Sequence, residues 1–198
     1  MEENFIKKLE IDDELNNEEI KSFSKKDLNI YRKDINHSKF LYSEILNSKL
    51  EKVYFKDVSF DNCNFSNTVF EGCSFIDCCF KNCKMTGCSF IENTFISVQI
   101  KDSNLNYANI SNTSFNNFKL NDTTFTNSYL QDTSLKNTKF KNVDLTNAQI
   151  FNTKLKNINL SNSKIEGLST TLDDIKGAIV NEFQVIDLAY LLQIKIDK

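Results

Sequence analysis

The sequence contains no proline and no tryptophan, and only four glycines and one histidine among its 198 residues. A chain without proline keeps its backbone N–H groups available as donors, which suits a fold in which nearly all of them bond in strand ladders. The four scattered glycines form no glycine-rich phosphate loop. The single histidine, His37, has no nucleophile to pair with, so we expect it to be structural. The absence of these motifs predicts a protein that is not an enzyme and that holds no cofactor.

Long apolar runs are also missing. No apolar stretch approaches 18 residues, and the first residues are acidic rather than basic and then apolar. The sequence therefore predicts neither a membrane span nor a secretory signal, and we expect a cytoplasmic protein. A hydrophobic content of 40% is enough for one core in a chain of this length.

The most regular feature is a period of five residues that runs from Ser38 to Glu166 without an insertion. The 26 positions from 40 to 165, here called register positions, hold twelve Phe, eight Leu, five Ile and Met85. The small positions, two residues earlier, carry Ser, Thr, Cys, Val or Ala in 23 of 26 cases; the exceptions are Asn93, Phe118 and Ile158. The corner positions, two residues after each register position, are Asn, Asp or Gly in 21 of 26 cases.

A period of five fits neither the 3.6-residue period of a helix nor the two-residue period of a strand. Self-similarity at a fixed period is typical of a solenoid, in which each unit buries its apolar side against its neighbours. Each unit would then place one large and one small side chain inward. The Asn, Asp and Gly residues supply the corners, because they tolerate unusual backbone angles.

Segments such as Cys63-Asn64-Phe65-Ser66-Asn67 and Ala108-Asn109-Ile110-Ser111-Asn112 resemble the units of the pentapeptide repeat family. The resemblance covers about two-thirds of the chain. It implies an all-β solenoid, namely a right-handed quadrilateral β-helix with four repeats in each coil, so 26 repeats give about 6.5 coils. We expect every register residue to point inward. Local distortion is expected at Asn93, Phe118 and Ile158, because a side chain too large for a small position pushes the backbone outward.

The two ends of the chain lose the pattern. Leu28 and Lys33 occupy small positions, so residues 1–37 are predicted to form an N-terminal cap outside the coils, with a short helix that starts near residues 16–19. Residues 38–166 are the predicted β-helix, and residues 167–198 a C-terminal cap with a dimerisation helix. Caps are expected because a bare terminal coil would offer free strand edges.

The C-terminal segment contains a predicted helix over residues 182–192. Asn181, with Gln184 three residues later, resembles a capping box at its start. The helix is apolar nearly all round, so one face can cover the last coil while the rest needs a partner. We predict a homodimer through Phe183, Ile186, Leu188, Tyr190, Leu191 and Leu192. Further on, Ile194 and Ile196 alternate with charged residues as in a short edge strand.

Six cysteines raise the question of a metal site, since Cys73, Cys78, Cys83 and Cys88 follow one another at regular spacing. Zinc would need four sulfurs at about 2.3 Å from one ion. Four repeats per coil would instead put these thiols on four different faces, separated by the register residues. We therefore predict a packing role and no metal. Cys63 and Cys83 should stack in adjacent coils, within disulfide range, and we expect them to be reduced.

The tail gives a second resemblance. Ile175-Lys176-Gly177 and Phe183-Gln184 resemble the C-terminal segment of the quinolone-resistance (Qnr-like) pentapeptide proteins. That resemblance implies a dimer that binds DNA gyrase or topoisomerase IV, shields it from fluoroquinolones and mimics duplex DNA with an acidic rod. Here residues 38–166 carry 14 basic and 12 acidic side chains, and the unbroken count leaves no projecting loops. Both features depart from that group.

The charges do not indicate direct nucleic-acid binding either. When counted over whole faces, the lysines of the coils are interleaved with Asp61, Asp102 and Asp122, so no basic stripe is evident. The leading hypothesis is a protein-interaction scaffold of unknown partner. The alternative is a DNA-mimicking binder of gyrase or topoisomerase IV, and an enzyme is the third possibility.

Overall fold

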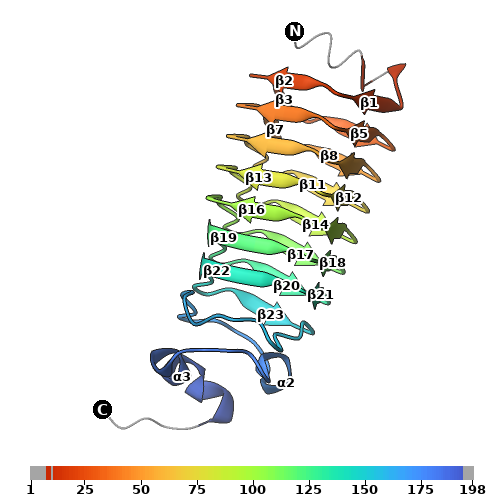
Figure 1. Cartoon of the computed structure of the whole chain (residues 1–198). Coiled ribbons are helices and arrows are strands. Elements are labelled where there is room, and N and C mark those ends of the chain that lie inside the picture. Colours follow the sequence, from red (N-terminus) through yellow and green to blue (C-terminus); the bar gives the residue numbers. More distant parts are fainter. Residues whose placement is uncertain (1–7, 10, 194–198) are drawn as a thin grey trace.

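The computed structural model describes residues 8–9 and 11–193, which form a rod of stacked coils with two short helices at the C-terminal end (Figure 1). Three sides of the rod are parallel sheets of seven strands each, so it contains about seven coils. Strands twenty residues apart pair in register, as Phe60 does with Phe80. The prediction of a four-sided β-helix is confirmed.

Each sheet takes one strand from every coil. Sheet A contains β1 (Glu14–Asn16), β5 (Asp34–Asn36), β9 (Tyr54–Lys56), β12 (Ser74–Ile76), β15 (Thr94–Ile96), β18 (Ser114–Asn116) and β21 (Ser134–Lys136). Sheet B contains β2 (Glu19–Lys21), β6 (Lys39–Leu41), β10 (Ser59–Asp61), β13 (Cys79–Lys81), β16 (Gln99–Lys101), β19 (Lys119–Thr124) and β22 (Lys139–Asp144).

The other two sides are built in the same way. Sheet C contains β4 (Asn29–Tyr31), β8 (Lys49–Glu51), β11 (Val69–Glu71), β14 (Ser89–Ile91), β17 (Asn109–Ser111), β20 (Tyr129–Gln131) and β23 (Gln149–Phe151). The fourth side has only β3 (Ser24–Lys26) and β7 (Glu44–Leu46), and it continues as single bridges such as Asn64 with Lys84.

The core is the column of register residues, of which 24 of 26 are buried. Phenylalanines twenty residues apart stack face to face, and in the central column Phe75 lies 4.9 Å from Phe55 and 4.7 Å from Phe95 between ring centroids. Rings from adjacent sides of one coil meet edge to face, as Phe75 and Phe80 do. Both arrangements are favourable for aromatic pairs.

The corner positions have the left-handed backbone that the sequence predicts. The backbone angle φ is about +50° to +60° at most of them, for example +58° at Asn67 and +53° at Asp77. Asn, Asp and Gly adopt this conformation at the lowest cost, which explains their frequency there. At Gly87 a Cβ atom would lie 2.5 Å from Oδ1 of Asn67 in the coil above, so this corner also needs glycine for space.

The prediction that residues 1–37 lie outside the coils is wrong, because strands β1 to β5 already follow the coil path from Glu14 onward. The predicted helix near residues 16–19 is therefore also wrong. The pattern is hidden because Phe23, at a small position, takes the buried place while Lys25, at a register position, is exposed. Lys33 bonds upward to the carbonyl of Asp12.

The three oversized small positions behave differently. Strand β15, which follows Asn93, keeps its register with β12. The Asn93 amide fits because its Oδ1 accepts from the N–H of Cys73 at 2.7 Å and its Nδ2 donates to the carbonyl of Phe70 at 3.0 Å. Phe118 turns its ring into the core, where it lies 4.4 Å from Phe115. Distortion at Asn93 was thus predicted wrongly, since a buried amide can use the bonds that a hydroxyl makes elsewhere.

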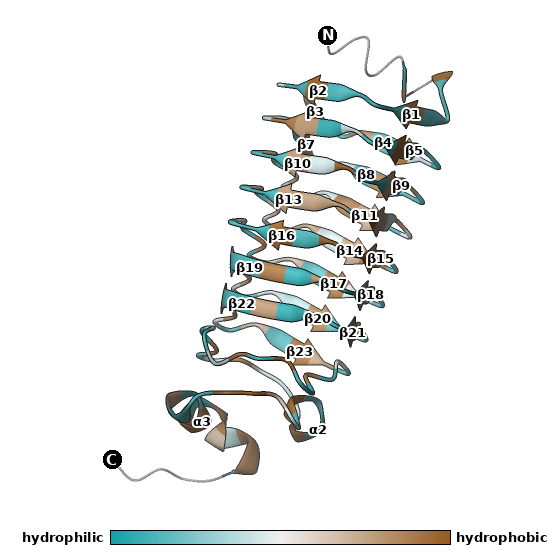
Figure 2. Cartoon of the chain, in the orientation of Figure 1, coloured by the Kyte–Doolittle hydropathy of each residue, from teal (hydrophilic) through white to brown (hydrophobic). Residues whose placement is uncertain are grey.

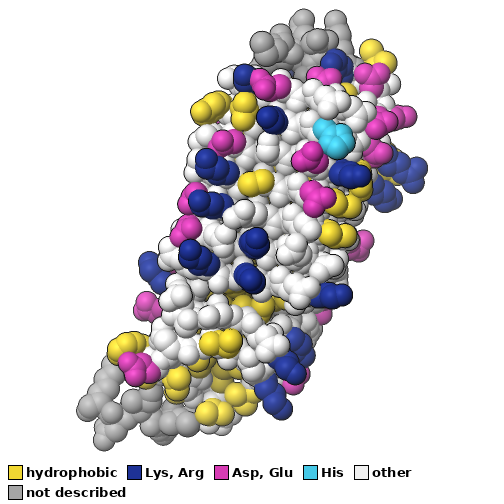
Figure 3. Space-filling model, in the orientation of Figure 1, with side chains coloured by type: hydrophobic (Ala, Val, Ile, Leu, Met, Phe, Trp, Pro, Cys, Tyr) yellow, Lys and Arg dark blue, Asp and Glu magenta, His cyan; other side chains and the backbone are white. Residues whose placement is uncertain are grey.

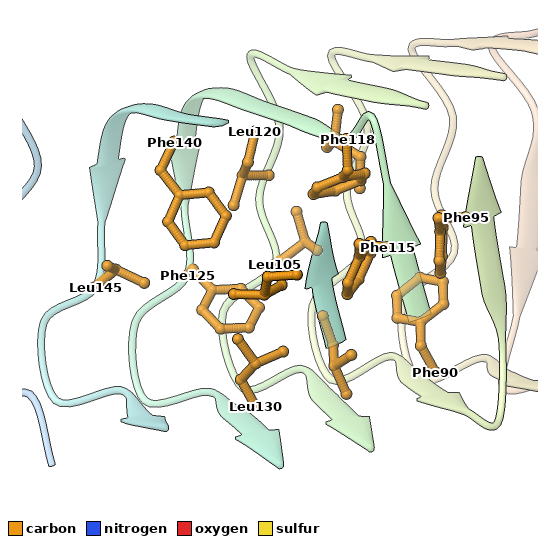
Figure 4. A pocket seen from close by; sticks show the side chains of 13 residues that line it. Phe90, Phe95, Leu105, Phe115, Phe118, Leu120, Phe125, Leu130, Phe140 and Leu145 are labelled. Atoms are coloured by element: carbon orange, nitrogen blue, oxygen red, sulfur yellow. The ribbon is translucent and has the colours of Figure 1, made fainter. Parts of the chain in front are cut away.

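Phe118 and Ile158 stand one coil above and one coil below Thr138. The two register residues next to Thr138, Leu135 and Phe140, are the only two of the 26 that are not fully buried. An apolar gap of about 20 Å³ lies in the same part of the rod and is lined by register residues and Phe118 (Figure 4). The strands next to Phe118 keep their register, so the outward shift of the backbone predicted there is not seen; the feature present is the partial exposure of Leu135 and Phe140.

The buried thiols take part in a hydrogen-bond pattern that they share with Ser and Thr. Thr68 Oγ1 and Ser128 Oγ donate to the carbonyl 23 residues earlier, at 2.7 and 2.8 Å. Cys63 Sγ, Cys73 Sγ and Cys83 Sγ donate to the equivalent carbonyls at 3.3 to 3.4 Å. These sulfurs thus act as small hydrogen-bonding side chains of the core, with Cys63 and Cys83 on the same side of the rod in adjacent coils.

Candidate interaction surface

The C-terminal segment begins with α2 (Leu172–Ile175), which is fastened to the rod by a buried carboxylate. Asp174 accepts hydrogen bonds from the N–H of Asn152 at 3.0 Å and from Thr171 Oγ1 at 2.8 Å, and Lys154 Nζ lies 3.0 Å from its other oxygen. Burial by itself would raise the pKa of Asp174, but the bonds from Thr171 and Lys154 hold this pKa below its ordinary value. The carboxylate thus remains charged and ties α2 to the preceding coil.

Helix α3 (Glu182–Leu188) starts as predicted. Asn181 Oδ1 accepts from the N–H groups of Phe183 and Gln184, and the Gln184 side chain accepts from the N–H of Asn181, which completes the capping box. The helix continues as a 3₁₀ turn, η1 (Ala189–Leu192). The two elements together cover the predicted range 182–192.

Polar side chains of this segment bond to the last backbone carbonyls of the rod. Gln184 Nε2 donates to the carbonyls of Leu160 and Ser163 at 2.8 and 2.7 Å, and Asn181 Nδ2 donates to that of Ser161 at 2.7 Å. Tyr190 Oη donates to the carbonyl of Leu168 at 2.5 Å. These carbonyls have no further coil to pair with, so the side chains complete the end of the ladder.

With its polar side turned to the rod, the segment leaves an apolar surface open to solvent. Phe183 and Ile186 are 73% and 60% exposed. Figure 2 shows the hydrophobic colouring of this end of the chain. We call the exposed set the C-terminal apolar face; it consists of Leu172, Ile179, Phe183, Val185, Ile186, Tyr190 and Leu192.

Four of the six residues predicted for a dimer interface lie on this face: Phe183, Ile186, Tyr190 and Leu192. Leu188 is partly buried and packs against the core of its own rod, and Leu191 is also partly buried. Leu188 and Leu191 therefore do not lie on the exposed surface predicted for the interface. The homodimer itself stays a prediction, and the predicted strand at Ile194 and Ile196 lies outside the described residues.

The sequence pattern did not single out Leu172, Ile179 and Val185. Phe183 and Ile186, three residues apart on α3, lie on one side of the helix, whereas Ile179 pairs with Asn159 in the segment before it. Ile179 precedes the capping residue Asn181, so a search limited to the helix could not include it.

The other candidates for chemistry lie apart from this face. His37 Nδ1 is 2.9 Å from Asp57 Oδ2, and both side chains are exposed at a corner of the rod. Burial raises the pKa of Cys73 to about 11 and that of Cys78 to about 12, so these thiols stay uncharged at neutral pH. Among the described residues, no three His, Cys, Asp or Glu side chains are arranged to hold a metal ion.

The repeats match the model of one protein family, described as the pentapeptide repeat region, over residues 53–113 and 98–173. These segments together span more than half of the chain. The chain belongs to the pentapeptide repeat family. No curated protein matches the sequence of this pentapeptide repeat protein. Within the described residues, no helix is long and apolar enough to cross a membrane.

Solved structures of other pentapeptide repeat proteins are similar at low identity. Full-length QnrB1, a plasmid-mediated fluoroquinolone resistance protein, matches with 16% identity and a TM-score of 0.46, over 86% of this chain and 100% of its own. HetL from the cyanobacterium Nostoc, involved in regulation of heterocyst differentiation, matches with 11% identity and a TM-score of 0.47, over 90% and 92% of the two chains. Rfr23 from Cyanothece 51142 has 12% identity and a TM-score of 0.33, over 90% and 99%.

Proposed function

We propose that this pentapeptide repeat protein is a non-enzymatic scaffold of the cytoplasm that acts through protein–protein contacts. The observation that supports the proposal is the C-terminal apolar face, which places seven large apolar side chains in solvent at one end of the rod. Contiguous exposed apolar surface of this kind marks interaction sites in monomeric chains. The face is held rigidly by the bonds of Asp174 and Gln184, so it is presented in one fixed geometry.

We further propose that the partner at this face is a second copy of the chain, related by a two-fold axis. A two-fold interface brings the same patch of both copies together, so a single apolar stripe is complementary to itself. Phe183, Ile186 and Tyr190 form such a stripe along α3 and η1, with the exposed side chains of Val185 and Leu192 beside it. A helical segment this short is only marginally stable alone, so a partner would also stabilise it.

We expect the wild-type protein to be a dimer, and the variants Phe183→Asp and Ile186→Asp to be monomers, because each places a charge in the centre of the apolar contact. Size-exclusion chromatography with light scattering measures the mass directly. Tyr107→Asp is the matched control: Tyr107 is 61% exposed on the coils, far from α3, and Asp tolerates its positive φ. A monomeric wild type, or variants that remain dimeric, would contradict the dimer.

Leu191→Asp is less suitable for this test, because Leu191 is partly buried and a charge there would disturb the segment itself. Phe183 and Ile186 are chosen because they are the most exposed large apolar residues of α3. Circular dichroism of both variants should therefore match that of the wild type.

A second candidate function rests on the resemblance of Ile175-Lys176-Gly177 and Phe183-Gln184 to the Qnr-like tail, namely binding of DNA gyrase or topoisomerase IV by charge mimicry. It would need carboxylates near the dimer centre. Asp173 and Asp174 lie there, but Lys154 pairs with both. Four acids lie near this end of the chain, namely Asp173, Asp174, Glu182 and Asp187. Among the described residues only Glu182 and Asp187 of these form no ion pair, so mimicry would be weak.

We therefore expect little or no inhibition of supercoiling by a bacterial gyrase, and little protection from ciprofloxacin, even at protein concentrations on the order of tens of micromolar. The assay measures supercoiling and cleaved DNA at rising protein concentration. Strong protection that disappears as salt rises would favour the gyrase candidate over the unidentified-partner scaffold, because electrostatic complementarity is screened by salt.

A further inference from the structure

The outward side of sheet B carries five lysines on four consecutive coils. Lys81 lies on β13 and Lys101 on β16, and these two are directly opposite each other in the ladder. Lys119 on β19 lies directly opposite Lys139 on β22, and Lys141 follows two residues later. Figure 3 shows dark-blue side chains gathered over this part of the rod. We call the set Lys81, Lys101, Lys119, Lys139 and Lys141 the lysine face.

The charges of the lysine face are only partly compensated, since Lys81 lies opposite Asp61 of β10 in the ladder and Lys101 has Asp102 beside it. Lys101 Nζ has the carboxylate of Asp102 at 3.6 Å, and the other four lysines have no carboxylate within 4.0 Å among the described residues. Sheet C shows the opposite arrangement, since Lys49 lies 3.0 Å from Glu51 and 2.9 Å from Glu71. Like charges directly opposite each other destabilise a sheet. The fold gains nothing from these pairs, so an anionic ligand would relieve their repulsion.

The surroundings indicate which anion fits. The other residues of these strands and their corners include Asn82, Gln99, Asn121, Asn142 and the partly buried Cys79. The acids are Asp102, Asp122 and Asp144, of which Asp144 pairs with Lys164 at 3.2 Å. A protein partner would need apolar or aromatic anchors at the centre of the contact, and the lysine face offers none. Contacts to a nucleic-acid backbone are polar and positively charged, as this surface is.

We propose that the lysine face binds the phosphate backbone of double-stranded nucleic acid without reading its sequence. At the strand spacing of about 4.8 Å, the four coils extend the lysines over roughly 14 Å, which can follow several phosphates. These strands carry no projecting loop or helix that could enter a groove, so base edges stay out of reach. Aromatic side chains are missing from this set, which disfavours single strands bound by stacking.

This surface is separate from the C-terminal apolar face and goes beyond the proposed scaffold function. The linear sequence does not indicate it because Asp61, Asp102 and Asp122 alternate with the lysines along the chain, and the lysines of β13 to β22 come together only when the coils stack. The chain as a whole has a net charge of −3, so binding depends on this local concentration of positive charge and requires low salt.

The test is fluorescence anisotropy with labelled duplexes of about 20 base pairs and two unrelated sequences, over roughly 20–150 mM salt. The triple variant Lys101→Gln, Lys119→Gln, Lys139→Gln removes three charges from the lysine face. The matched control Lys25→Gln, Lys26→Gln, Lys156→Gln removes three exposed lysines elsewhere. We expect the first variant to bind about tenfold more weakly or worse, with the salt slope reduced by about 3, and the control to bind within about twofold of the wild type.

Several outcomes would overturn the proposal. These are an equal loss of affinity in the control variant, a marked preference between the two duplexes, and no duplex binding by the wild type at the lowest salt. Binding of poly-glutamate in preference to duplex would assign the lysine face to an acidic protein instead. Equal affinity for both duplexes, together with a loss confined to the first variant, supports the backbone contact.

Discussion

Phe75→Ala is expected to lower the free energy of unfolding by about 3–5 kcal/mol, the range found for Phe to Ala changes in packed cores. Phe75 is fully buried at the middle of the rod, and its ring contacts the rings of Phe55 and Phe95 above and below. It also meets Phe70 and Phe80 edge to face within its own coil. Alanine would leave a cavity that the paired strands and bridges around this coil cannot close.

Ile76→Ala is the control, because Ile76 is the next residue on β12 and points outward. Urea unfolding followed by circular dichroism compares the two variants with the wild type, and we expect Ile76→Ala to cost about 1 kcal/mol or less. Coils interact only with their neighbours, so hydrogen exchange in Phe75→Ala should accelerate first in β9, β12 and β15. Equal losses in both variants would contradict a core that depends on stacked register residues.

The second large effect is expected for Asp174→Ala, which should destabilise the C-terminal segment by about 1–3 kcal/mol, the cost of leaving a buried donor without its partner. The change removes the acceptor for the N–H of Asn152 and for the hydroxyl of Thr171. Hydrogen exchange of α2 and α3 should rise while that of the coils stays unchanged. Asp173→Ala is the control, since the Asp173 side chain is 83% exposed and forms an exposed ion pair with Lys154.

The same carboxylate gives a pH dependence with a defined sign. Because the folded state holds the pKa of Asp174 below its ordinary value, folding favours the charged form. Its contribution is complete above the unfolded-state pKa of about 4 and is lost as pH falls through the lower folded-state pKa. Asp144, whose pKa is also lowered through its bonds from Thr146 and Lys164, acts in the same direction.

Wild type and Asp174→Ala should therefore differ in stability at pH 7 and converge as the pH falls below about 4. Thermal unfolding at several pH values measures this difference, and Asp144 cancels because both proteins contain it. A difference that stays constant down to pH 3 would show that the Asp174 carboxylate stabilises the fold through something other than its charge.

The unbroken period of five was enough to predict the β-helix, its core and its corners, because each coil repeats the same local chemistry and contacts only the next coil. The capping box of Asn181 and Gln184 was readable for the same reason, since both partners lie within four residues. The cysteines at small positions could be predicted to pack in the core rather than bind a metal, because four repeats per coil place consecutive thiols on different sides. Patterns among residues close together in the sequence predict local geometry without knowledge of the tertiary structure.

The tertiary structure decided the features that depend on residues one coil apart or at the end of the rod. The first coil starts at Glu14, although Phe23 and Leu28 occupy small positions, because its strands pair with those of the next coil, a contact between residues twenty apart. Leu188 turns inward because Gln184 and Tyr190 bond to the last carbonyls and so fix which side of α3 faces solvent. The lysine face exists only because the twenty-residue coil brings Lys81 opposite Lys101 and Lys119 opposite Lys139.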